Sequence, residues 1–183
     1  MIPVPSLELE QIRERLWAQL EAAAAERGHA WRTPVLATVG GPAGADARVV
    51  VLREVDAASR SLVFFTDARS PKAAQIAAQP AGTLVMWSAA RGWQLRLTVV
   101  LEIETSGLAV SSRWARLQMS PASQDYLAPR PPGAAMTTAP ERESRAHFAV
   151  VTAQVQSMDW LALDPAGHRR AVFDEHGARW VQP

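Results

Sequence analysis

The side chains best suited to chemistry in this sequence gather at strand ends and at the start of one helix. Arg48 begins an apolar run and Arg53 ends it, Thr66 ends the next run, and Ser70 and Lys72 open a short helix. Adjacent antiparallel strands can bring such ends together, and a helix N-terminus adds unpaired N–H groups and a partial positive charge. Cationic and hydroxyl groups at one such point predict a pocket for a phosphate group.

One of these residues is unusual in its own right. Lys72 is the only lysine among the 19 basic residues of the chain. Its ammonium group is a compact point charge, which the planar guanidinium of arginine does not always replace. The alternative interpretation is that Lys72 is a chance surface residue, that Ser70 only caps the helix, and that both arginines lie on a solvated strand face. The spacing of these residues leaves both interpretations open.

Other familiar catalytic sets are missing from the sequence. The four histidines lack metal-ligand spacing, and His168 and His176 lie on either side of a predicted turn. There is no nucleophile elbow of the G-x-S-x-G type and no Walker-type loop. The glycine-rich segment 40–44 separates two predicted strands and precedes no helix, which is typical of a hairpin loop. We therefore expect no metal site, and we assign no catalytic residue.

Composition narrows the class of protein further. The 183 residues fit one domain, and 48% of them are hydrophobic, as in a globular protein. The formal net charge of +1 argues against a general nucleic-acid binder. The absence of cysteine excludes disulfides and thiolate chemistry. We see neither a secretory leader nor an apolar run of membrane-spanning length, so we expect a cytoplasmic protein.

The elements that must position the candidate residues follow from hydrophobic spacing. Leu9, Ile12, Leu16 and Leu20 recur at three- and four-residue steps and predict a helix within residues 1–28. Short runs rich in β-branched residues then predict antiparallel strands. We expect these strands at 34–39, 48–53, 61–66, 83–88, 93–104 and 147–163, followed by a closing hairpin at 169–173 and 179–182.

Two short helices and one loop interrupt the strands. Ser70 as N-cap and Pro71 at the first helical position predict a helix that ends before Pro80. A second helix is expected at 109–118, and a Pro-rich surface loop at 127–140. The fold class is therefore mainly β, an antiparallel barrel built from about six to seven of these strands with a few helices, in a single domain over 1–183.

Several blocks of this chain resemble the FMN-binding segments of the pyridoxamine 5'-phosphate oxidase family. They are RVVVLR at 48–53, FFTDARSPK at 64–72 and WQLRL at 93–97, in the same order and at similar spacing. The closing segment, from His168 to Pro183, resembles the C-terminal hairpin of that family. The resemblance covers roughly residues 33–104 and 147–183, and it implies an FMN-binding split β-barrel.

The resemblance also implies roles for individual positions. Arg48 and Lys72 would hold the FMN phosphate with the hydroxyls of Thr66 and Ser70. The strand segment 49–52 would present backbone groups to the flavin ring. Gln94 would hydrogen-bond the ring, and Ser123 would lie near the phosphate. The implied cofactor-binding set is Arg48, Val49, Val50, Val51, Leu52, Arg53, Phe65, Thr66, Ser70, Lys72, Gln94 and Ser123.

The chain departs from the family pattern at polar positions. Pro71 replaces the arginine of the helix start, with Arg69 two residues upstream as the candidate to compensate, and Ala122 replaces a glutamine of the S-x-Q-S block. Near the C-terminus, no histidine follows Arg170 two residues later. The changes at Pro71 and Ala122 concern FMN binding. The missing histidine, and the segment that reads SSRWARLQ here at 111–118, correspond to motifs with which the vitamin-B6 oxidase holds its substrate, so we expect a divergent member with a different, unknown substrate. Arg53 and Arg169 are the remaining partners for a substrate anion.

We therefore expect a flavin-dependent oxidoreductase that passes a hydride from a small-molecule substrate to FMN and then to O₂ or another acceptor. The ring would lie between the subunits of a homodimer, since a barrel of this size cannot enclose it and fill its own core. Neither a nucleic acid nor a membrane is expected as a partner.

Three alternatives remain open at this point. The chain could hold FMN without turnover, as a carrier or redox sensor. It could bind a deazaflavin or haem instead, or bind no cofactor and serve as an interaction protein. The tryptophans could stack on a flavin, although packing in the core or at a dimer interface is the commoner use of such residues; they include Trp87, Trp93, Trp114 and Trp160.

Overall fold

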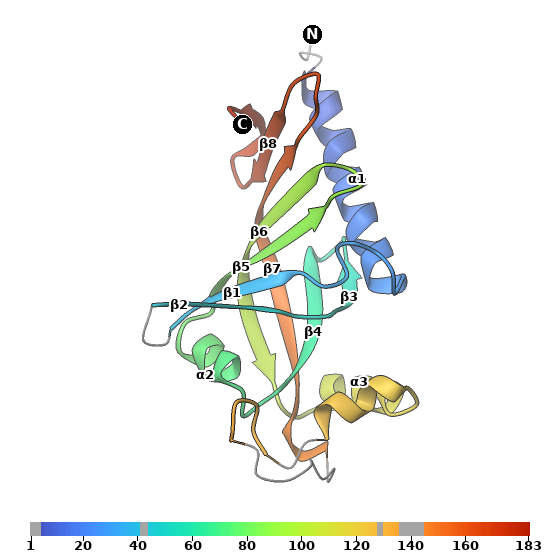
Figure 1. The fold of residues 1–183 in the computed structure, drawn as a ribbon, viewed down its shortest axis with the longest axis vertical. Helices are drawn as coiled ribbons and strands as arrows, with labels where there is room; N and C mark the ends of the chain where they lie inside the picture. Colours follow the sequence, from blue (N-terminus) through green and yellow to red (C-terminus); the bar gives the residue numbers. More distant parts are fainter. Residues whose placement is uncertain (1–4, 41–43, 128–129, 136–144) are drawn as a thin grey trace.

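The computed structural model of the chain describes residues 5–40, 44–127, 130–135 and 145–183. In this part the chain forms one antiparallel sheet system, with helices at its periphery (Figure 1). The strands are β1 (Val35–Val39), β2 (Ala45–Val49), β3 (Leu52–Asp56), β4 (Ser61–Asp67), β5 (Ala81–Ser88), β6 (Trp93–Glu104), β7 (Phe148–Ala162), β8 (Arg169–Asp174) and β9 (Gly177–Val181). The helices are α1 (Pro5–Ala25), α2 (Pro71–Ala78) and α3 (Leu108–Leu117), with 3₁₀ turns at Pro121–Tyr126 and Arg145–His147.

The sheet order is β2-β1-β5-β6-β7-β4-β3, and the hairpin of β8 and β9 continues from β7. This arrangement confirms the expected mainly β, split-barrel fold. The expected count of six to seven strands was too low, because the described residues form nine. One cause is the apolar run 48–53, which is not a single strand.

That run switches partners halfway along. Residues up to Val49 pair with β1, whereas residues from Leu52 pair with β4. At the switch, the N–H of Val50 donates to the carbonyl of Pro34, and the N–H of Leu52 donates to that of Arg32. The barrel closes at this corner, so two short strands replace the predicted long one.

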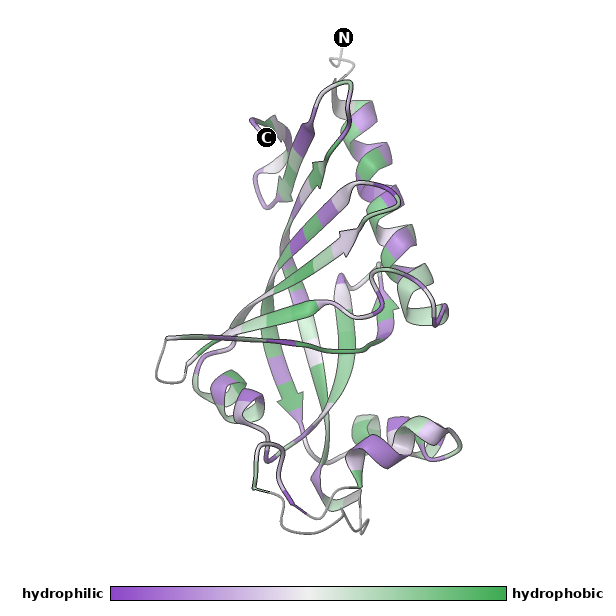
Figure 2. Cartoon of the chain, in the orientation of Figure 1, coloured by the Kyte–Doolittle hydropathy of each residue, from purple (hydrophilic) through white to green (hydrophobic). Residues whose placement is uncertain are grey.

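The first helix covers the main core. Leu9, Ile12, Leu16 and Leu20 are all buried, which confirms the apolar stripe predicted from their spacing. Figure 2 shows the polar residues of α1 on its other faces and apolar residues along the central strands. The helix contacts β3 and β9, so one end of the barrel is closed by α1 and the C-terminal hairpin.

A second, smaller core lies at the other end of the long strands. Phe148 of β7 packs there with Trp114 of α3 and with Phe65 of β4. Tyr126 from the 3₁₀ turn contacts the same ring of Phe148. This cluster fixes the segment after α3 against the end of β4, near the start of α2.

The Pro-rich stretch 127–140 is only partly described. Leu127 is half-buried, and residues 130–135 are exposed, in line with a surface loop. Residues 128–129 and 136–140 lie outside the described residues, as do residues 1–4 of the predicted N-terminal helix. None of the described helices is long and apolar enough to span a membrane.

Candidate functional site

Three of the predicted phosphate-binding side chains lie together where β4 ends and α2 begins. The ammonium of Lys72 donates to Oγ1 of Thr66 at 3.0 Å, and Oγ1 of Thr66 lies 3.3 Å from Oγ of Ser70. Thr66 and Ser70 are 3% and 1% exposed. Thr66, Ser70 and Lys72 therefore lie together, as the sequence predicted. We call these three residues the β4–α2 cluster.

The hydroxyl of Ser70 is not used as a helix cap. Ser70 occupies the N-cap position of α2, but its side chain makes no capping hydrogen bond. Only its carbonyl oxygen serves the helix, by accepting from the N–H of Ala73 at 3.0 Å. Ser70 is therefore the N-cap residue by position, but its hydroxyl does not cap the helix and lies beside the hydroxyl of Thr66 instead.

The electrostatics of this cluster favour an anion. Burial lowers the pKa of Lys72 below its usual range, and the nearby charge of Arg48 lowers the pKa further. Asp67 and Asp46 act in the opposite direction, but more weakly. Two positive groups close together in a half-buried place destabilise each other, and a bound anion would relieve both.

Arg48 itself is held by polar groups that the sequence analysis did not identify. Its Nη1 donates to Oγ1 of Thr38 at 2.6 Å, and its Nη2 donates to Oε1 of Gln75 at 2.9 Å. Asp46 forms an ion pair with the same guanidinium and accepts from Nε2 of Gln75 at 3.0 Å. Arg48 therefore ties β2 to β1 and α2, while its Nε makes no hydrogen bond to the described part of the chain.

Two of these partners carry a weak signal in the sequence. Gln75 follows Lys72 by three residues, so both lie on one face of α2. Thr38 pairs with Asp46 across β1 and β2, two positions from the pair of Leu36 with Arg48. Thr38, Asp46 and Gln75 meet at the Arg48 guanidinium because β1 and β2 pair in this register and because α2 packs against β1.

The segment 49–52 offers few free backbone groups. The N–H groups of Val50 and Leu52 are used at the barrel corner. The N–H of Val51 makes no backbone hydrogen bond to any described residue, and Val51 lies between the ends of two strands. Val51 is therefore the position at which this segment can still present a donor. Val49 is 61% exposed on the outer face of the sheet.

Arg53 and Phe65 lie in a separate group around the second core. Nη2 of Arg53 donates to the hydroxyl of Tyr126 at 3.2 Å, and its guanidinium lies 5.7 Å from the centre of the Phe65 ring. Nε of Arg53 is buried and has no hydrogen-bond partner in the described structure. A buried donor without a partner is costly, so this group is suited to an acceptor from a ligand.

The two remaining predicted residues do not join the β4–α2 cluster. Oγ of Ser123 donates to the carbonyl of Ser120 at 2.9 Å, so this buried hydroxyl stabilises its own turn. Gln94 lies on β6 opposite Trp87, half-buried on the outer face of the sheet. Its side chain makes no hydrogen bond to the described residues, which leaves its amide available on that face.

Arg69 is not free to replace the charge lost at Pro71. Its Nε and Nη2 donate to both carboxylate oxygens of Asp67 at 3.0 and 2.7 Å, and Nη2 also reaches the carbonyl of Arg130. The tryptophans differ in their placement: Trp114 and Trp160 are buried in the cores, while Trp87 is 47% exposed. No group of three His, Asp or Glu side chains within the described ranges is arranged to hold a metal.

The comparisons with known proteins agree with this fold. Residues 14–104 match the family model described as pyridoxamine 5'-phosphate oxidase, FMN-binding domain. A pyridoxine/pyridoxamine 5'-phosphate oxidase of Thermosynechococcus vestitus is 47% identical over 62 residues, which are 34% of this chain. The match spans only 28% of the length of that relative.

Two solved structures share the fold over nearly the whole chain. A pyridoxamine 5'-phosphate oxidase-related, FMN binding protein from Nostoc punctiforme has a TM-score of 0.73 and 23% identity, and the match covers 92% of this chain and 96% of that one. PhzG from Burkholderia lata, in complex with tetrahydrophenazine-1-carboxylic acid, has a TM-score of 0.72 and 15% identity, with coverage of 94% and 91%. At such identities the similarity concerns the fold and not the reaction.

Proposed function

Because this chain belongs to the pyridoxamine 5'-phosphate oxidase-like family, we propose that it binds FMN and works as an FMN-dependent oxidoreductase on a small-molecule substrate. The observation that carries the proposal is the β4–α2 cluster, in which Lys72, Thr66 and Ser70 present a cation and two hydroxyls at a helix start. A phosphate monoester is the anion that such a set of donors fits best.

The residues of this cluster fit the phosphate of FMN. The ammonium of Lys72 and the hydroxyls of Ser70 and Thr66 would donate to its oxygens. Arg48 would support them through its charge, and its Nε would be the group available to donate to the phosphate while Thr38 and Gln75 hold the other two nitrogens. Asp46 neutralises part of the Arg48 charge, so Lys72 provides the main electrostatic attraction.

The chain also offers groups for the ring and for a substrate. The N–H of Val51 would donate to an acceptor on the ring edge, and Gln94 would contribute its amide from a second subunit. The unpartnered Nε of Arg53 is suited to an anionic group of the substrate. When bound, FMN supplies the redox chemistry, and the protein binds, orients and shields it.

We propose further that the protein is a homodimer with FMN at the interface. On the outer face of β2, β1, β5 and β6, apolar side chains of neighbouring strands lie opposite one another, for example Val49, Val35 and Val85. Val49, Trp87 and Val100 are 61%, 47% and 45% exposed there, and Gln94 lies beside Trp87. An apolar face of this kind favours burial against another copy. The cytoplasmic location expected from the sequence stays a prediction.

The absorbance spectrum of the full chain, purified with and without added FMN, tests the proposal. We expect flavin bands that stay with the protein through gel filtration and weaken in Lys72→Ala. Arg27→Ala is the matched control, because Arg27 is exposed and outside the cluster. If wild type does not retain FMN at micromolar concentration, the proposal is refuted. If the purified protein instead shows the spectrum of a deazaflavin or of haem, that group and not FMN is its cofactor.

A flavin-holding protein without turnover is the second candidate. The absence of a histidine two residues after Arg170 favours it, since one substrate group of the family is then missing. Mixing the FMN-loaded protein with NADH or NADPH, followed by exposure to air, separates the two candidates. Bleaching and recovery of the flavin band support the oxidoreductase, whereas a band unchanged by these and other hydride donors supports the carrier.

A further inference from the structure

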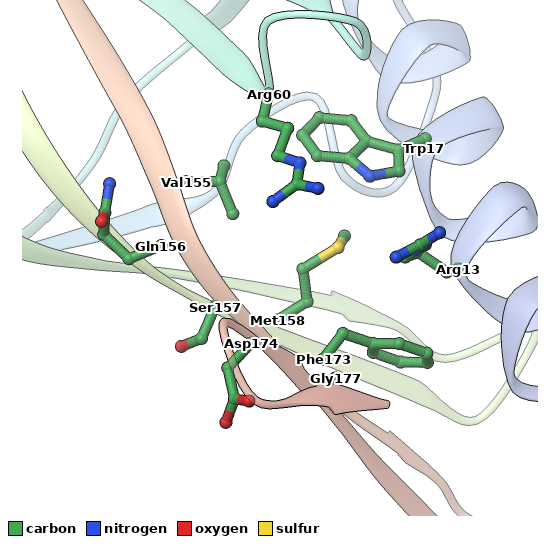
Figure 3. A pocket seen from close by; sticks show the side chains of 10 residues that line it. All are labelled: Arg13, Trp17, Arg60, Val155, Gln156, Ser157, Met158, Phe173, Asp174 and Gly177. Carbon is green, nitrogen blue, oxygen red and sulfur yellow. The ribbon is translucent and has the colours of Figure 1, made fainter. Parts of the chain in front are cut away.

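A cavity lies between α1, the turn before β4, and the strands β7 and β8, away from the cluster described above (Figure 3). Its volume is about 50 Å³, and it opens to solvent. This is room for a small polar head group or a few waters. The mouth of the cavity leaves space for the rest of a ligand.

Two arginines face this cavity from different elements. Arg13 projects from α1, and Arg60 projects from the turn between β3 and β4 (Figure 3). Arg60 has no ion pair or side-chain hydrogen bond with any described residue, whereas Arg13 pairs with Glu10 one turn earlier in α1. The one carboxylate at the edge, Asp174, is held at both oxygens by Arg179 at 2.9 and 2.7 Å. The cavity therefore has an excess of positive charge.

The rest of the lining is apolar and aromatic. Met158 and Phe173 form the floor, and Trp17 forms one wall, with its indole nitrogen turned toward the same space (Figure 3). The indole N–H of Trp17 has no hydrogen-bond partner in the described structure. Cationic donors and one N–H group above an aromatic floor are a combination that recognises an organic carboxylate.

The backbone around the cavity is irregular at two points. Arg60 has a φ of 53°, and it is the only non-glycine residue with a positive φ in the described ranges. The β6–β7 register shifts beside Thr98, where Gln156 is the extra residue on β7. A long side chain in the left-handed region is disfavoured, and bulges often re-aim side chains near binding sites. Both irregularities border the cavity.

The cavity is distinct from the phosphate-binding cluster. Arg60 precedes β4, whereas Thr66 lies near the opposite end of the same strand. Six residues of extended chain separate them by about 20 Å. No residue of the β4–α2 cluster lines the cavity.

We propose that this cavity is a second ligand site, specific for a small organic carboxylate with an aromatic body. Arg60 binds the carboxylate, Arg13 adds charge from the other side, and the Trp17 N–H donates a further hydrogen bond. The aromatic body of the ligand extends from the mouth over the apolar lining of Phe173 and Met158. The site lies between α1 and the C-terminal hairpin, so its ligand would link these two elements.

Titration of the full-length protein with benzoate tests this proposal. The readout is the indole ¹H–¹⁵N resonance of Trp17, assigned by its loss in Trp17→Phe. We expect a saturable shift with benzoate and none with benzamide, which has the same shape without the charge. Arg60→Gly should weaken benzoate binding about tenfold, as expected for loss of a charge-assisted hydrogen bond.

Two controls keep the result specific. Arg60→Gly suits the positive φ at this position, so its melting temperature should not fall and the loss cannot be ascribed to unfolding. Lys72→Ala should leave the shift unchanged, since it alters only the phosphate-binding cluster. The proposal is overturned if benzoate causes no shift at about 10 mM, if benzamide acts equally, or if Lys72→Ala rather than Arg60→Gly removes the effect.

Discussion

The ammonium of Lys72 lies 3.0 Å from the hydroxyl oxygen of Thr66, across the junction of β4 and α2. Thr66 lies at the end of β4 and Lys72 at the start of α2, and Ser70, which lies between them in sequence, contacts Thr66 through its hydroxyl. The only lysine of the chain is thus held in a half-buried place beside a second cation. A bound anion would relieve the repulsion between these two cations.

Replacement of Lys72 by alanine should weaken FMN binding about 10- to 100-fold. A hydrogen bond to a charged group contributes about 1.5–3 kcal/mol, and each 1.4 kcal/mol is about tenfold in affinity. Quenching of FMN fluorescence on binding measures the dissociation constant. Arg27→Ala should bind as wild type does, because Arg27 is exposed and distant from α2. Equal affinity of Lys72→Ala and wild type would exclude Lys72 from the phosphate site.

The lowered pKa of Lys72 predicts a defined pH dependence of stability. Burial, followed by the charge of Arg48, lowers the folded pKa below its ordinary value of 10.5. The protonated form is therefore disfavoured in the folded state. The resulting penalty is full below the folded pKa and is relieved as the pH rises from there to 10.5.

Urea unfolding of wild type and Lys72→Met without FMN measures this penalty at a series of pH values. The stability advantage of Lys72→Met should be largest at neutral pH and should shrink as the pH approaches 10.5. The difference in unfolding free energy between the two proteins at each pH cancels the contributions of the titratable groups that they share. An advantage that stays constant up to high pH would show that the charge of Lys72 is not the cause.

Gln75 is expected to stabilise the junction of α2 with β1 and β2. Its amide joins Arg48, Thr38 and Asp46 at 2.6–3.0 Å. Gln75→Leu removes one hydrogen-bond partner from each of these groups and should cost about 1–3 kcal/mol in the free energy of unfolding. Gln79→Ala, at an exposed position that ends the same helix, should cost much less. Equal losses for the two variants would contradict the network.

The apolar outer face of the sheet predicts the oligomeric state. Trp87→Glu places a charge in the middle of that face and should convert a dimer into a monomer, because burying an unpaired charge is costly. Light scattering during gel filtration measures the mass. Leu108→Glu is the control, since Leu108 is 84% exposed on α3 and away from this face. A monomeric wild type would refute the dimer.

The positive φ of Arg60 predicts a stabilising substitution. Arg60→Gly removes a conformation that costs about 1 kcal/mol in residues with a side chain, so the free energy of unfolding should rise by up to that amount. Thermal and chemical unfolding measure the change. Arg60→Ala, which keeps the backbone penalty and also lacks the guanidinium, should not be stabilised. A gain in both variants would instead mean that the guanidinium itself destabilises the fold.

Much of the fold could be predicted because it depends on local patterns. The spacing of Leu9, Ile12, Leu16 and Leu20 specifies one buried helix face, and the structure buries all four. The strands β4 and β6 and the start of α2 lie where β-branched runs and the Ser70-Pro71 pair predicted them. Periodicity and capping act over a few residues, so one sequence suffices to detect them.

The division of residues 48–53 could not be predicted in the same way. Its apolar, β-branched composition suits one strand, yet β2 and β3 pair with different neighbours. The choice of partner depends on where β1 and β4 lie in the closed barrel, and those positions are decided by non-local contacts. The same limit applies to Arg48, whose partners Thr38 and Gln75 come from two other elements.

The sequence by itself determined the class of fold, the buried face of α1 and the placement of Lys72, Ser70 and Thr66 at one junction, because these follow from short-range spacing. Only the tertiary structure decided that Ser70, the N-cap residue of α2, turns its hydroxyl to Thr66, that the Ser123 hydroxyl donates to Ser120, and that Arg13 and Arg60 face one cavity. Arg13 and Arg60 lie far apart in the chain, whereas the two serine hydroxyls contact residues three or four positions away. Their geometry depends on how strands pair and how α1 packs, which local sequence preference does not specify.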